Sequence, residues 1–177
     1  CVRFSPDTKA PVLASGSWDG QIKIFDPTTM ALKNTFVGHT NAVTSLAFAQ
    51  KAMYLASGGK DGNILLWNVD AGEFIKSHQH SAPINQVLFS KINYWIAAAT
   101  DSGIIIWDIV KETVIATQQV FKGEDERDDD DNKDEKKIVT KEPLACLSIA
   151  WSKNGTYLYS GWSDNKIRVY ETSSKTN

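Results

Sequence analysis

One residue pattern recurs four times along the 177-residue chain, at a spacing of about 40 residues. It reads LASGSWDGQIKIFD at Leu13–Asp26 and LASGGKDGNILLWN at Leu55–Asn68. In each copy an aspartate is followed six residues later by an aromatic side chain: Asp19 and Phe25, Asp61 and Trp67, Asp101 and Trp107, Asp164 and Tyr170. An active site needs one copy of its residues, whereas a repeat of this length indicates a unit that buries its apolar face against the next copy. The chain is therefore expected to form an array or a propeller of four units.

Each unit is expected to consist of β-strands. In the second unit Ala42–Ala49, Tyr54–Gly59 and Asn63–Val69 are short, rich in β-branched and aromatic residues, and separated by turn residues. KDGN at Lys60–Asn63 places Asp-Gly between two apolar runs, which is a strong hairpin signal. Polar and apolar residues do not alternate cleanly, as in IIIWDIV at Ile104–Val110, and this is typical of sheets covered on both faces. The predicted secondary structure is almost entirely antiparallel β.

The composition is that of an ordinary globular protein, with 42% hydrophobic residues, 23% charged residues and a net charge of −2. No apolar run is long enough for a transmembrane helix, and the opening residues CVRFSPD show no signal-peptide features. Cys1 and Cys146 lie far apart and form no CxxC pair. We interpret them as reduced thiols of a cytosolic protein, with Cys146 in a buried strand. A disulfide between them is the less favoured alternative.

The segment Gly38–Asn68 resembles a complete WD40 repeat, with Gly-His at its start and Trp followed by a polar residue at its end. The resemblance extends to all four units and implies an all-β fold of four WD40 β-propeller blades, part of a seven-bladed propeller. The expected blades are residues 1–36 with a truncated first strand, 37–77, 78–117, and 144–177 without an outer strand; residues 118–143 are expected to form an acidic disordered loop. Both ends are then open blade edges, through which two copies could pair as a homodimer.

The chain resembles, more closely, the family of the receptor for activated C kinase. The segments that carry this resemblance are Cys1–Pro6, Phe36–Thr40, Leu55–Gly62, Asn93–Thr100 and Trp107–Ile109. It implies a non-catalytic cytoplasmic scaffold that binds protein kinase C and other signalling proteins and, at full length, associates with the small ribosomal subunit. That ribosomal contact relies mainly on first blades that this chain does not contain. The alternative is a WD40 subunit of another complex, in chromatin, ubiquitin-ligase or trafficking machinery.

His39, Ser57, Asp61 and Trp67 share one unit and could suggest a hydrolase triad. The WD40 resemblance implies instead a buried hydrogen-bonded chain from Trp through Ser and His to Asp. The other units keep only part of this set: Ser15 and Asp19 in the first, His80, Asp101 and Trp107 in the third, Ser160 and Asp164 in the fourth. A stabilising network tolerates such graded loss, whereas a catalytic site does not. We therefore expect no enzyme, no cofactor, no metal and no small-molecule substrate, and we expect His78 in a surface loop.

Several side chains are candidate protein contacts. Trp18, Lys60 and Trp162 lie in or beside the loop that carries the blade aspartate, and exposed Trp is a favoured interface anchor. Packing between blades is the alternative for both Trp residues. By resemblance, Tyr94 aligns with a tyrosine linked to Src-type kinases. The same resemblance places protein kinase C docking in two segments of the third unit, with core packing as the stronger explanation for most of their side chains; the residues concerned are Ile84, Asn85, Ile104, Trp107 and Asp108.

An acidic insertion, KGEDERDDDDNKDEKK, occupies Lys122–Lys137. It holds nine acidic and five basic residues and no apolar one, so it is expected to be a mobile loop. A calcium site at Asp128–Asp131 is the less favoured alternative, because the spaced pattern of an EF-hand is missing. The charge of the insertion favours a basic protein surface over RNA phosphates.

Overall fold

A computed structural model describes all residues except 9, 51–53, 122–141 and 173–177. The described residues form fifteen strands in four antiparallel sheets, each sheet built from strands consecutive in sequence. The first sheet contains β1 (Val2–Phe4), β2 (Leu13–Gly16), β3 (Gln21–Phe25) and β4 (Leu32–Val37). The second contains β5 (Val43–Phe48), β6 (Tyr54–Gly59), β7 (Asn63–Asn68) and β8 (Glu73–Gln79). The third contains β9 (Ile84–Phe89), β10 (Trp95–Thr100), β11 (Gly103–Asp108) and β12 (Thr113–Gln118), and the fourth β13 (Cys146–Trp151), β14 (Tyr157–Trp162) and β15 (Ile167–Glu171).

The predicted Asp-Gly hairpin joins β6 to β7. Gly62 adopts a φ of 80°, a left-handed conformation that glycine reaches without steric cost. The Asp61 carboxylate accepts a hydrogen bond from the Asn63 amide at 3.0 Å and closes the turn. Gly20 repeats this conformation in the β2–β3 turn, with a φ of 81°. The repeated Asp-Gly therefore encodes the same turn in the first two sheets.

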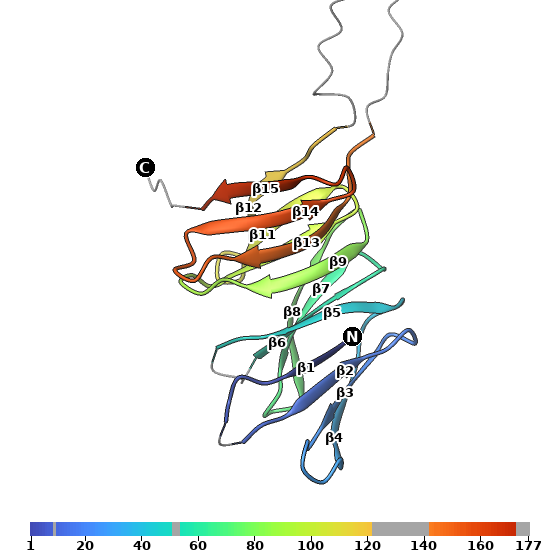
Figure 1. The fold of residues 1–177 in the computed structure, drawn as a ribbon. Helices are drawn as coiled ribbons and strands as arrows, with labels where there is room; N and C mark the ends of the chain where they lie inside the picture. Colours follow the sequence, from blue (N-terminus) through green and yellow to red (C-terminus); the bar gives the residue numbers. More distant parts are fainter. Residues whose placement is uncertain (9, 51–53, 122–141, 173–177) are drawn as a thin grey trace, which may run out of the picture.

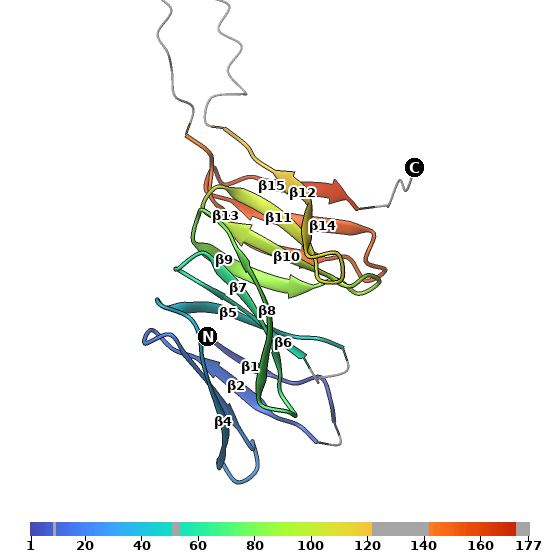
Figure 2. The same ribbon diagram turned by 180° about the vertical axis from the view of Figure 1, so that it is seen from behind.

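The sheets stack one behind the other, from the blue first sheet to the red fourth sheet (Figures 1 and 2). The first strands of the sheets, β1, β5, β9 and β13, contact one another in that order. Within each sheet, strand order follows chain order outward from this inner strand. This is the predicted arrangement of β-propeller blades, and it puts the turns of every sheet at its two ends.

Three apolar cores lie between the stacked sheets. In β6, Leu55 packs toward the first sheet, whereas the next residue, Ala56, packs toward the third. Phe36 of the first sheet stacks on Trp67 of the second, with 5.0 Å between ring centroids and 9° between ring planes. Because successive residues of a middle strand enter different cores, such strands are apolar throughout. The predicted burial of both faces is confirmed for the second and third sheets.

The outward faces of the first and fourth sheets carry exposed apolar side chains. Phe4 is 64% exposed on the first sheet, and Ile167 and Val169 are 78% and 52% exposed on the fourth. The fourth sheet has three strands within the described part of the chain. These two faces differ from the covered faces of the second and third sheets.

Both cysteines are free thiols, as predicted. Cys146 is buried at the start of β13, and this burial raises the pKa of its thiol to about 11. Cys1 is exposed. Among the described residues, no helix has the length and apolar character needed to span a bilayer. The acidic insertion predicted at Lys122–Lys137 lies outside the described residues.

Candidate functional site

Four side chains of the second sheet form a continuous hydrogen-bonded chain. The Trp67 indole N–H donates to Ser57 Oγ at 2.9 Å, and Ser57 Oγ lies 2.8 Å from His39 Nε2. On the other side of the ring, His39 Nδ1 lies 3.0 and 3.1 Å from the two Asp61 oxygens. The consistent assignment has Nδ1–H donating to the carboxylate and Ser57 O–H donating to Nε2. The chain thus ties the segment after β4 to the middle of β6 and β7.

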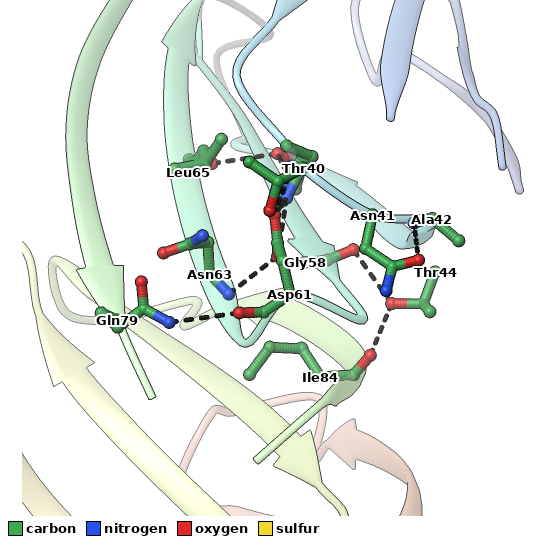
Figure 3. Close-up of polar contacts among 12 residues, drawn as sticks. Thr40, Asn41, Ala42, Thr44, Gly58, Asp61, Asn63, Leu65, Gln79 and Ile84 are labelled. Atoms are coloured by element: carbon green, nitrogen blue, oxygen red, sulfur yellow. Dashed lines mark hydrogen bonds and ion pairs between the residues drawn. The ribbon is translucent and has the colours of Figure 1, made fainter. Parts of the chain in front are cut away.

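Asp61 holds the surface end of this chain in place (Figure 3). Its carboxylate also accepts the Thr40 amide N–H at 2.8 Å and the Asn63 amide N–H at 3.0 Å. Gln79 Nε2 donates to the main-chain carbonyl oxygen of Asp61 at 3.1 Å. Burial acts to raise the pKa of Asp61, but the two backbone N–H groups and the His39 ring together lower it below its ordinary value. The carboxylate is therefore ionised at neutral pH and holds two turns together.

The buried histidine is neutral. Burial lowers the pKa of His39, and the Asp61 carboxylate opposes that effect only in part. The side chain of His39 is 0% exposed and Ser57 is 0% exposed, so a substrate cannot reach the hydroxyl or the ring. A nucleophile and its base must contact the reacting atoms. The geometry is therefore that of a sealed structural network.

Hydrogen bonds between adjacent inner strands were not anticipated from sequence. Thr44 Oγ1 lies 2.9 Å from the Gly58 carbonyl oxygen and 2.5 Å from that of Ile84, and so joins the second and third sheets (Figure 3). Ser45 Oγ accepts the Val87 amide N–H at 3.1 Å in the same interface. Small hydroxyl side chains at successive positions of an inner strand are the only sequence signal for these links.

The third sheet departs from the predicted network. His80 Nε2 lies 3.0 Å from Ser102 Oγ, while Asp101 accepts a hydrogen bond from Asn85 Nδ2 at 2.8 Å. His80 and Asp101 are therefore both hydrogen-bonded, but to different partners, so the His–Asp link of the second sheet is not repeated here. His78 lies in β8, half-buried and stacked on Trp107 at 5.7 Å between ring centroids, so its expected place in a loop is wrong.

In the fourth sheet an arginine bonds the blade aspartate, as a histidine does in the second sheet. Arg168 donates to both Asp164 oxygens, at 3.0 and 2.7 Å, and its guanidinium lies 5.3 Å from the Trp162 ring centroid. The Trp162 indole N–H donates to Ser160 Oγ at 2.7 Å. The role of Arg168 was not predicted from the sequence, because only the pairing of β14 with β15 places Arg168 opposite Ser160. In the first sheet, Asp19 accepts the Gln21 amide at 2.9 Å, and Ser15 has an intermediate exposure.

The candidate contact residues separate into exposed and buried groups. Trp18 is 88% exposed in the β2–β3 turn, and Lys60 is exposed in the equivalent turn of the second sheet. Tyr94 is 76% exposed in the β9–β10 turn, at the other end of its sheet. Trp162 is only 3% exposed, because its ring packs in the core between the third and fourth sheets. Its proposed role as an exposed anchor is therefore wrong.

Most side chains of the kinase-docking segments are internal. Ile84, Ile104, Trp107 and Asp108 are all buried. The Asp108 carboxylate accepts the amides that follow it and the Trp95 indole N–H, the latter at 3.2 Å. Asn85 Nδ2 bonds Asp101 and the Cys146 carbonyl, and so links the third and fourth sheets. Core packing therefore accounts for these segments.

No group of three or more His, Cys, Asp or Glu suited to a metal ion occurs among the described residues. The calcium alternative at Asp128–Asp131 lies outside them.

Comparisons with known proteins agree with this architecture. A family model described as the Vps8 beta-propeller matches residues 9–148, and the model of the WD domain, G-beta repeat, matches residues 138–171. A rice (Oryza sativa subsp. japonica) protein named small ribosomal subunit protein RACK1y is 35% identical over 173 residues. This match covers 98% of the chain but 47% of the rice protein, so the chain spans about half the length of that relative.

Among solved structures, the Cps50 (Swd1) beta-propeller domain from Myceliophteria thermophila superposes with a TM-score of 0.78. The match covers 97% of this chain and 51% of that one, at 23% identity. At that identity the likeness establishes the β-propeller fold alone.

Proposed function

The chain belongs to the WD40-repeat family of β-propellers, and we propose that it works as a non-catalytic scaffold that binds other proteins. One observation carries this proposal. The His39–Ser57–Asp61 cluster, which resembles a catalytic triad, is sealed inside a blade, whereas Trp18 and Tyr94 project large aromatic surfaces from hydrogen-bonded turns. Exposed aromatic side chains on a stiff scaffold are typical interface anchors.

We propose protein kinase C, other signalling proteins and the small ribosomal subunit as partners. Identity of 35% to a small ribosomal subunit protein over 98% of the chain supports the ribosomal partner, and the resemblance described in the sequence analysis supports the kinase. The proposed location is the cytoplasm, with a fraction of the protein on ribosomes. The chain spans 47% of that relative, and we expect most of the ribosomal contact to lie on blades outside this chain.

The alternative is a WD40 subunit of another complex, in chromatin, ubiquitin-ligase or trafficking machinery. The match of the Vps8 beta-propeller model over residues 9–148 favours it.

Affinity capture from a cytoplasmic extract tests the proposal. The tagged chain is expected to retain protein kinase C and, only weakly, small-subunit ribosomal proteins, and Trp18→Ala is expected to reduce the capture of the kinase several-fold. Val110→Ala is the matched control, because Val110 is also an exposed apolar side chain in a turn, 67% exposed. Retention of chromatin, ubiquitin-ligase or trafficking subunits instead would overturn the proposed partners in favour of the alternative.

A further inference from the structure

A pocket of about 710 Å³ opens between the second and third sheets, at the end of the blades away from the Asp61 turn. Both sheets contribute to its apolar floor, which consists of Leu66, Ile75, Phe89 and Ile109. Polar and aromatic side chains line its mouth, among them Tyr54 at the start of β6 and Lys91, Asn93 and Tyr94 of the β9–β10 turn. A concave apolar surface with a few polar groups at its edge is typical of ligand-binding sites.

The walls of this pocket are fixed by backbone hydrogen bonds. The Ser90 amide donates to the Trp95 carbonyl at 2.8 Å, and the Ile109 amide donates to the Tyr94 carbonyl at 2.9 Å. Ser90 Oγ accepts the Asn93 amide at 3.3 Å and closes the β9–β10 turn. The turn that carries Lys91 and Tyr94 is therefore preorganised, which lowers the entropic cost of binding.

Among the described residues that line the pocket, Lys91 is the one charged side chain, and no ion pair joins it to another described residue. Lys76, by contrast, is already paired with Glu112. An apolar floor beside an unpaired ammonium group complements a ligand that has a bulky apolar group next to a carboxylate. A single lysine does not match a nucleic acid, whose affinity comes from several phosphate contacts.

We propose that this pocket binds a short acidic peptide segment of a partner protein, with one aliphatic or aromatic side chain on the floor and an Asp or Glu beside Lys91. The inference rests on the proposed scaffold function, because it names the kind of partner segment that the scaffold takes. It assigns Tyr94 the role of a pocket rim, together with Tyr54 of the neighbouring blade.

A random twelve-residue peptide library displayed on phage, selected on the immobilised chain, tests this directly. Enriched peptides are expected to share an acidic residue next to a bulky apolar one. A synthetic copy of the most enriched peptide is expected to bind Lys91→Glu and Ile92→Asp at least tenfold more weakly. Both residues are exposed pocket-lining positions, so the variants should keep the wild-type melting temperature.

Lys23→Glu is the matched control, because it reverses an exposed lysine in β3 of the first sheet, outside the lining of the pocket. It is expected to leave peptide affinity unchanged. The inference is overturned if no peptide is enriched, or if the enriched peptide binds Lys91→Glu and Ile92→Asp as tightly as the wild type. That result would leave the capture of protein partners through Trp18 unaffected. The peptide experiment can therefore refute the pocket while the scaffold proposal still stands.

Discussion

At the scale of single residues, one buried hydroxyl joins two other buried side chains by hydrogen bonds. Ser57 Oγ accepts from Trp67 and donates to His39 at the same time. The third sheet has Ala98 at the corresponding position, and Trp107 there stacks on His78 as Trp67 stacks on Phe36. A buried polar group is costly when its partner is removed, but its absence is tolerated where the surroundings supply another contact.

Ser57→Ala is therefore expected to lower the free energy of unfolding by about 1–3 kcal/mol, because it leaves the Trp67 N–H and the His39 ring without their buried partner. Ser15→Ala, at the equivalent position of the first sheet, is the control and should change stability by less than about 0.5 kcal/mol. Urea denaturation of both variants measures the difference. Equal effects of the two substitutions would contradict a special role for Ser57.

The His39 network also predicts how stability depends on pH. Burial lowers the pKa of His39 in the folded state, so below about pH 6.5 the unfolded chain binds more protons than the folded one. Stability is then complete above that pH and falls as the solution is acidified toward pH 5. Burial also lowers the pKa values of His78 and His80, which adds to the same slope.

His39→Ala should lower the melting temperature at pH 7.5 and make its fall between pH 7.5 and pH 5 shallower than in the wild type. Thermal melts at several pH values test both effects. An unchanged slope would mean that His39 does not titrate differently in the folded and unfolded states. Asp61 changes the pH dependence of stability only at lower pH. Because the pKa of Asp61 is lowered in the folded state, its ionised carboxylate stabilises the fold above about pH 4, the ordinary aspartate pKa, and this stabilisation is lost as the pH falls further.

At the scale of elements, strands and turns followed from the sequence because local rules decide them. Asp-Gly placed the β6–β7 hairpin, and continuous apolar runs indicated sheets with both faces covered. The burial of Trp162 could also have been predicted from the sequence, since Trp162 alternates with Leu158 and Ser160 on one face of the strand.

Side-chain partners between elements were harder to predict. Asp101 pairs with Asn85 because β9 brings that amide within reach, and His80 bonds the neighbouring Ser102. The turns also differ in register: Thr100 pairs with Gly103 in the third sheet, whereas the last pair before the turn of the second sheet is Gly58 with Ile64. Repeat position therefore predicted the complete network of the second sheet and misled in the third.

The arginine of the fourth sheet gives a prediction at this scale. Arg168→Ala should lower the melting temperature by about 2–4 °C, because it removes a bidentate partner of Asp164 and uncovers the Trp162 ring. Arg168→Lys should recover only part of the loss, since lysine lacks the planar fork. Lys33→Ala, which breaks the exposed pair with Asp26, is the control and should leave the melting temperature unchanged.

At the scale of the whole molecule, stability comes from contacts between neighbouring sheets. Each of the three cores takes side chains from two sheets, and the inner strands add polar links at Thr44, Ser45 and Asn85. In such an array a unit is stabilised by its neighbours. The second and third sheets have a neighbour on both faces, whereas the first and fourth have one within the described part of the chain.

The two outward faces lead to a prediction about association. Exposed apolar surface and strand edges favour pairing between chains, so the 177-residue chain is expected to form dimers at micromolar concentration. Val169→Lys, on the outward face of the fourth sheet, should shift the mass measured by light scattering toward the monomer. Val110→Lys changes an equally apolar side chain in the β11–β12 turn and should leave the mass unaltered. A wild-type chain that stays monomeric at 100 µM would show that these faces do not pair.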